Sequence, residues 1–141
     1  PLANIQVLRL NEIISKHSKN SIRLRKRLMD LNYHLLGNYP EGGISVSPRV
    51  PFLVKDQKSF IAFFANRGVE VGTWFDGPLT PPPQDSIFNF KKSDHPNASF
   101  VARHIVNLPC HSKMKDFHLK LIEQSLEEYA LEYPDHFQIE K

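Results

Sequence analysis

Two segments of this chain carry apolar residues on one face at helical spacing, and each stripe has to be buried against another element of the fold. In residues 21–36 leucines recur at steps of four, three and four, while arginine and lysine occupy the other face. In residues 115–132 apolar residues recur at steps of three, four and three. Each pattern predicts an amphipathic helix, the first ended by Gly37 and the second by Pro134. The stripes are formed by Leu24, Leu28, Leu31 and Leu35, and by Leu119, Ile122, Leu126 and Tyr129.

Weaker patterns predict three further helices. Residues 2–17 have helix-like apolar spacing, and residues 96–104 begin with a proline, which suits the first turn of a helix. Asp56 is a suitable N-cap for a helix over residues 57–67, which Gly68 would close.

Short apolar runs between these helices predict strands over residues 44–54, 69–75 and 105–108. Two prolines in the first run favour an edge position, because proline cannot donate to the ladder. Residues 76–96 predict a long loop, and a connection of that length is typical of a functional segment. The order of elements predicts an α+β fold: a small antiparallel or mixed sheet of about three strands with helices packed on one face.

We expect one structural domain overall, because 141 residues are enough for a single core. Within it, residues 1–37 form a long interface helix region, residues 38–133 the α+β body and residues 134–141 a loose tail. The net charge of +3 is too small to favour a nucleic-acid partner, and no apolar run approaches the roughly 20 residues of a membrane span. One cysteine allows no internal disulfide, which fits a cytoplasmic location.

Several polar groups are candidates for a functional site. His104, Cys110 and His111 lack the second ligand pair that a zinc site requires, so no metal site is predicted. Neighbours in sequence rarely form a nucleophile–base pair, which favours a structural role for Cys110. The basic residues between Lys16 and Arg27 are balanced by acidic residues near the end of the chain, which favours a solvated helix face over a phosphate site.

Trp74 and Phe75 end a predicted strand and lead into the proline-rich loop. Two large rings at this position either cover the edge of the core or line a pocket for a flat ligand such as a sugar or a base. The residue types alone leave both interpretations open.

Three segments, taken in order, resemble the carboxy-terminal part of the DegT/DnrJ/StrS family of aminotransferases. The first is Ala-Asn-Ile-Gln at residues 3–6, followed by a helix that carries Arg23 and Arg27. The second runs from Arg-Val-Pro-Phe-Leu-Val at residues 49–54 to Trp-Phe-Asp-Gly-Pro-Leu at residues 74–79, and the third is Asn-Leu-Pro-Cys-His at residues 107–111. The resemblance covers roughly residues 3–133, and it implies the small domain of a fold-type I aminotransferase.

The resemblance implies that the chain is part of an enzyme that transfers an amino group from glutamate to a keto-sugar nucleotide with pyridoxal phosphate. In the intact enzyme this domain would close over the cofactor and substrate site. Trp74, Phe75, Thr80, His111 and Arg49 are then the expected substrate-binding residues, with the ring pair as pocket wall and Arg49 contacting a carboxylate or phosphate. Thr80 departs from the family, which usually has histidine there.

A second departure concerns Lys115, where the family often has a threonine or serine that caps the last helix; Ser112 or Asp116 is the expected replacement. The larger departure is that no lysine of this chain matches the motif of the lysine that anchors the coenzyme. We therefore expect no catalytic and no cofactor-binding residue here, no pyridoxal phosphate bound to the chain alone, and no activity by itself. The expected partners are a missing large domain and a second subunit, with nucleotide-sugar and glutamate as substrates.

The alternative hypothesis is a stand-alone α+β module for binding, regulation or oligomerisation, without catalysis. Apolar surface left by a missing large domain would favour a homo-oligomer. A nucleic-acid binder that uses the basic helix ranks last, and no membrane partner is expected.

Overall fold

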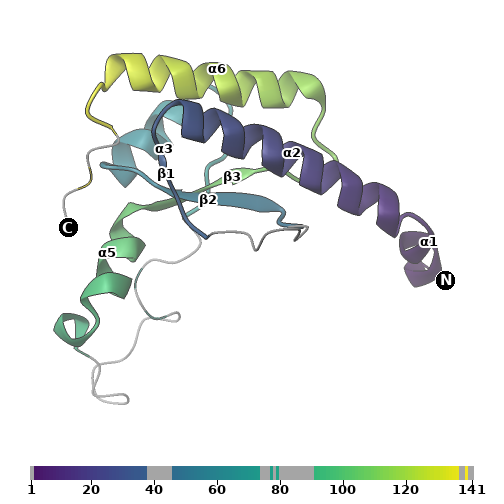
Figure 1. Ribbon diagram of the computed structural model, residues 1–141, viewed down its shortest axis with the longest axis horizontal. Coiled ribbons are helices and arrows are strands. Elements are labelled where there is room, and N and C mark those ends of the chain that lie inside the picture. Colours follow the sequence, from purple (N-terminus) through teal and green to yellow (C-terminus); the bar gives the residue numbers. More distant parts are fainter. Residues whose placement is uncertain are drawn as a thin grey trace.

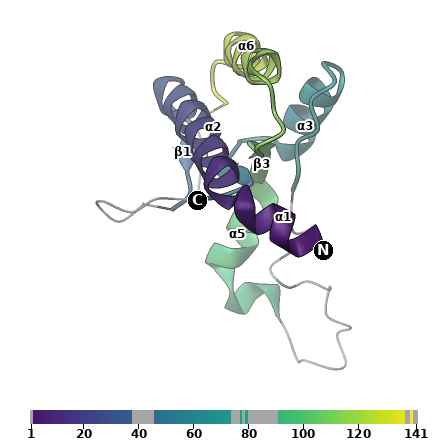
Figure 2. The same cartoon turned by 90° about the vertical axis from the view of Figure 1, so that its right-hand side faces the viewer.

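The structure, a computed structural model, describes residues 2–37, 46–73, 77, 79, 91–136 and 139. Its sheet has three antiparallel strands in the order β1 (His34–Leu35), β2 (Arg49–Leu53) and β3 (Ile105–Pro109). Helices α2 (Leu10–Asp30), α3 (Gln57–Ala65) and α6 (Asp116–Glu132) cover one face of this sheet (Figures 1 and 2). The predicted α+β fold class is confirmed.

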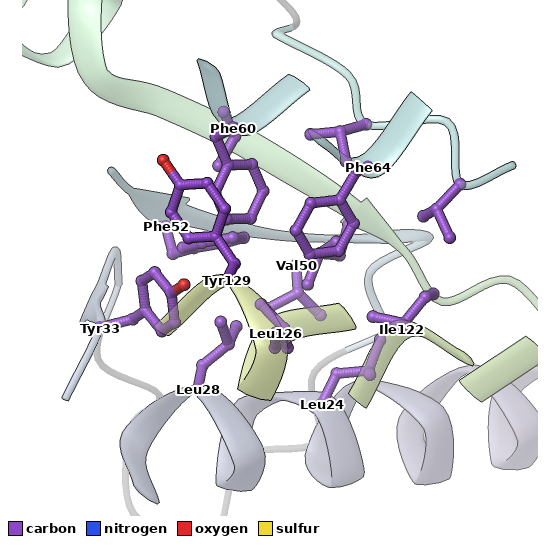
Figure 3. Packing of buried hydrophobic residues seen from close by; sticks show 14 of the residues in the cluster. Leu24, Leu28, Tyr33, Val50, Phe52, Phe60, Phe64, Ile122, Leu126 and Tyr129 are labelled. Atoms are coloured by element: carbon purple, nitrogen blue, oxygen red, sulfur yellow. The ribbon is translucent and has the colours of Figure 1, made fainter. Parts of the chain in front are cut away.

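The core lies between this sheet face and the three helices. Alternate residues of β2 and of the segment after it point inward, and so do alternate residues around β3. Phe60 of α3 lies among the rings of Phe52, Phe64 and Tyr129 (Figure 3). The inward-facing residues of the two strands are Val50, Phe52, Val54, Val106, Leu108 and Cys110, each with no exposed surface.

Helix α2 differs from the prediction at both ends. A short helix, α1 (Leu2–Leu8), precedes it, and α2 then runs unbroken to Asp30, whereas we predicted separate helices over 2–17 and 21–36. The predicted end at Gly37 is wrong because Asn32 adopts a left-handed conformation with φ of 61°. The Tyr33 N–H then bonds the Leu28 carbonyl at 2.9 Å, and the chain enters β1.

Ion pairs join α2 to α6 along the solvent side of the core. Arg23 contacts Asp116 at 2.6 Å and Glu123 at 2.5 Å, and Arg27 pairs with Glu127. Two arginines of the basic face of α2 are therefore balanced by acidic residues of α6.

Strand β2 lies between β1 and β3, so the predicted edge position is wrong for the strand as a whole. Pro51 lies opposite Asn107 in the register of β2 and β3. The N–H and the carbonyl of Asn107 both bond Gly72, so Asn107 needs no N–H from Pro51. On its other side the Pro51 carbonyl accepts from the Leu36 N–H at 3.4 Å, beyond the end of the two-residue β1. The N–H that proline lacks thus faces a place where the ladder has already ended.

Helix α5 (Pro96–His104) leads into β3, and the segment 69–73 lies beside this strand. The helix begins at a proline as predicted, follows the short helix η1 (Lys92–Asp94), and extends away from the helix layer (Figure 1). The predicted strand over 69–75 is described as far as Thr73, and it joins β3 through backbone bonds of 3.1 and 2.7 Å between Gly72 and Asn107.

Helix α6 follows the prediction closely. Its N-cap is Lys115, whose N–H donates to His118 Nδ1 at 3.0 Å, so neither Ser112 nor Asp116 caps it.

The Asp56 cap of α3 is confirmed, and it supports a prediction about pH. Asp56 Oδ1 accepts from the backbone N–H groups of Lys58 at 3.0 Å and Ser59 at 3.1 Å. The Ser59 hydroxyl and N–H hold the pKa of the Asp56 carboxyl below its usual range. A carboxyl whose pKa is lower in the folded chain stabilises it above the unfolded pKa, and this stabilisation is lost as the pH falls.

Asp56→Ala is therefore expected to lower the free energy of unfolding by about 1 kcal/mol at pH 7. The difference from the parent chain should shrink as the pH falls below about 4. Urea unfolding at both pH values checks this, with Asp56→Asn as the variant that keeps an acceptor. An equal loss at neutral and acid pH would contradict the proposed charge dependence of the cap.

Candidate functional site

The structure places two of the five predicted substrate-binding residues. Arg49 begins β2 and pairs in register with Pro109, and His111 follows Pro109 by two residues, so both lie at the same end of the sheet. Trp74, Phe75 and Thr80 lie outside the described residues. The described part of the candidate site is therefore built from β2, β3 and the segment 69–73.

Arg49 lies on the sheet face opposite the helices, because Val50 and Phe52 point into the core. Its side chain reaches across β3 to Gly72, where an added Cβ would lie 2.4 Å from Arg49 Nη1. Glycine at position 72 thus makes room for the guanidinium. Among the described residues no carboxylate forms an ion pair with Arg49, which is a half-buried cation on the sheet face opposite α2, α3 and α6.

Asn107 fixes the position of Gly72 beside β3. It is 3% exposed, its backbone bonds both groups of Gly72, and its side-chain amide donates to the Gly72 carbonyl at 3.4 Å. Asn107 and Gly72 were not predicted as site residues. The available signal was a single asparagine inside an otherwise apolar strand, a position that requires a hydrogen-bond partner when buried.

His111 is exposed and borders a shallow, mostly apolar pocket of about 160 Å³. Its backbone is fixed to α2, because Asn20 Nδ2 donates to the His111 carbonyl at 3.2 Å. The segment 69–73 runs antiparallel to β3, so this pocket adjoins Val69 and lies at the opposite end of the segment from Thr73. The structure therefore brings His111 near the start of the segment and Arg49 over its middle.

The described residues do not fit pyridoxal phosphate. The coenzyme needs a lysine in an enclosed site, an acidic partner and a phosphate cup. Every lysine whose side chain is described is exposed; these are Lys16, Lys19, Lys26, Lys55, Lys58, Lys91, Lys113, Lys115 and Lys120. In the same part of the chain no group of three or more His, Cys, Asp or Glu side chains is placed to hold a metal ion. No helix among the described residues has the length and apolar character required to cross a bilayer.

Cys110 is buried without exposed surface, and its Sγ donates to the Ser47 carbonyl at 2.9 Å. Burial raises the pKa of the Cys110 thiol to about 11, although the charge of Arg49 acts in the opposite direction. Because the thiolate is the reactive form, we expect a thiol-specific reagent to modify native Cys110 orders of magnitude more slowly than the urea-unfolded chain. Comparable native and unfolded rates would contradict the structural role of this cysteine.

With this geometry established, comparisons identify the family. The family model of the DegT/DnrJ/EryC1/StrS aminotransferases matches residues 2–127, and the chain belongs to that family. A search of the curated proteins found no match.

Solved structures share the fold. A Streptococcus pneumoniae protein named as a sugar aminotransferase, Spr1654, in its PMP form, has a TM-score of 0.78 at 16% identity over 91% of this chain and 33% of its own. S. venezuelae DesV, solved with a ketimine intermediate, has a TM-score of 0.74 at 17% identity over 92% and 35%. The sugar aminotransferase CalS13 from Micromonospora echinospora has a TM-score of 0.68 at 13% identity over 86% and 32%. The chain thus spans about a third of the length of each.

Proposed function

We propose that this chain is the carboxy-terminal small domain of a pyridoxal-phosphate-dependent nucleotide-sugar aminotransferase and is inactive by itself. Family membership over residues 2–127 supports the class, and the match to a third of each solved relative supports a domain of a larger enzyme. The observation that carries the proposal is the sheet itself. One face is covered by three helices, while the other presents Arg49, without a carboxylate partner among the described residues.

In the proposed enzyme the sheet face that carries Arg49 covers the cofactor and substrate site. Arg49 would donate to a carboxylate or phosphate of the substrates, because a guanidinium matches both groups with paired donors. Trp74 and Phe75 remain the proposed pocket wall, Thr80 and His111 the proposed polar contacts, and glutamate and a nucleotide-sugar the proposed substrates. The coenzyme would be held by a large domain and a second subunit. Residues 1–37 would connect to the large domain. A cytoplasmic location stays a prediction that rests on the single cysteine.

A coenzyme and turnover assay tests the proposal. The chain is mixed with pyridoxal phosphate, glutamate and a keto-sugar nucleotide, and amino-sugar formation and coenzyme absorbance are followed. We expect no turnover and the same spectrum as that of the mixture without the chain. Full-length CalS13 serves as the positive control. Turnover by this chain would contradict the proposal that it is inactive alone.

A specific observation favours a second candidate, an oligomerisation module. Four apolar side chains around the junction of α1 and α2 are largely exposed: Ile5 at 54%, Val7 at 68%, Leu8 at 85% and Leu10 at 48%. Such a group is typical of a docking surface. Light scattering across a concentration series tests the module, which should double its mass and lose that ability in Leu8→Glu. A monomer at all concentrations favours the proposed domain.

A further inference from the structure

A groove of about 440 Å³ lies between the amino-terminal helices and the loop 112–115 that leads into α6. Arg9, Glu12 and Lys16 border it on one side, and Ser112, Lys113 and Lys115 on the other. Its volume is within the range of about 300–1,000 Å³ that is typical of small-molecule sites. The lining elements belong to the helix layer, whereas Arg49 lies on the opposite face of the sheet, so this groove is separate from the Arg49 side of the candidate site. It adjoins the pocket beside His111, because Met114 borders both.

The groove carries an excess of positive charge. Four basic side chains and one carboxylate line it, which leaves three positive charges uncompensated. Glu12 is already engaged, because it contacts Lys16 Nζ at 2.6 Å and Arg9 Nε at 3.9 Å. No carboxylate of the described residues forms an ion pair with Lys113 or Lys115. The neighbouring Asp116 is engaged by Arg23 and Lys120 instead, at 2.6 and 3.0 Å.

The two sides of the groove are fixed to each other. The Ser112 N–H donates to His17 Nε2 at 3.4 Å, and Asn20 Nδ2 donates to the carbonyls of Cys110 at 3.4 Å and His111 at 3.2 Å. These bonds tie the loop that precedes Lys113 to the helix that carries Lys16. Fixing the backbone of the two sides before a ligand arrives reduces the entropic cost of binding.

We propose that this groove binds a small polyphosphate, either inorganic diphosphate or the diphosphate group of a nucleotide. A single carboxylate would neutralise one charge and leave the other cations repelling one another, whereas a diphosphate supplies several charges within one compact group. Lysine binds phosphate as a point charge, so the separate Lys16, Lys113 and Lys115 side chains suit its oxygens. The assignment does not depend on aminotransferase activity.

Calorimetric titration of the chain with inorganic diphosphate at low salt tests the proposal. We expect saturable binding, which Lys113→Gln combined with Lys115→Gln weakens at least tenfold. Glu12→Gln should bind a few-fold more tightly, because it removes the competing carboxylate. Lys19→Gln and Lys26→Gln are matched controls on α2 outside the groove, since both lysines are exposed. They should change the affinity less than twofold.

Three further arms complete the test. A nucleoside diphosphate that binds at least tenfold more tightly than diphosphate identifies a nucleotide, whereas equal affinities identify the diphosphate group as the ligand; both results support the site. Citrate that binds as tightly as diphosphate overturns the phosphate assignment. Absence of diphosphate binding, or equal losses in the groove and control variants, overturns the site itself. Because no arm measures transamination, failure here is distinct from failure of the proposed function.

Discussion

Replacing Phe60 by alanine is expected to lower the free energy of unfolding by about 3–5 kcal/mol. Phe60 is fully buried, and its ring centroid lies 4.4 Å from that of Phe64, 4.8 Å from Tyr129 and 5.6 Å from Phe52 (Figure 3). Alanine would leave a cavity bordered by these rings, which belong to β2, α6 and α3 itself and cannot all move inward. Because domains of this size are stable by only about 5–15 kcal/mol, the loss should be plain in urea unfolding followed by circular dichroism.

Phe117→Ala is the matched control for this substitution. Phe117 lies on α6 and is 60% exposed, so its truncation should change stability by no more than about 0.5 kcal/mol. Similar losses in the Phe60 and Phe117 variants would contradict the position assigned to the core.

Leu28→Ala is expected to cost about 2–5 kcal/mol. Leu28 has no exposed surface and points from α2 into the aromatic cluster near Tyr33 and Leu126 (Figure 3). Ile22→Ala on the same helix is the control, because Ile22 is 64% exposed and should lose less than about 0.5 kcal/mol. Urea unfolding of both variants measures the difference.

The Leu28 and Ile22 variants also test whether the chain divides structurally at residue 37. Residues 1–37 were expected to form an interface region, and that division stays a prediction. In the structure the inner face of α2 contributes Leu24 and Leu28 to the same core as β2 and α6, whereas Leu8 of α1 is 85% exposed. Equal effects of the Leu28 and Ile22 substitutions would mean that α2 is not part of this core.

The elements that the sequence predicted well depend on local chemistry. Helix α6 begins within one residue of the prediction, because its stripe repeats without interruption, and Asp56 caps α3 through groups two and three residues away. Such contacts are set by spacing along the chain. The α+β class followed from the order of these elements.

The features that the sequence did not predict depend on contacts between distant segments or on one backbone conformation. Leu35 continues the leucine stripe, yet the left-handed conformation of Asn32 places it in a strand. Pro51 suggested an edge, yet its strand is central, and the proline is tolerated because β1 ends one residue before the position opposite it. The close approach of Arg49 to Gly72 requires β2, β3 and the segment 69–73 in register, which no local pattern specifies.

The most direct test of the central claim is borohydride reduction of the chain after incubation with pyridoxal phosphate, followed by peptide mapping. A lysine that anchors the coenzyme is modified selectively and to near stoichiometry, because its site binds the coenzyme first. For this chain, in which every lysine with a described side chain is exposed, we predict weak labelling spread over many lysines. Near-stoichiometric modification of one lysine would contradict the claim that the chain only covers a coenzyme site held elsewhere.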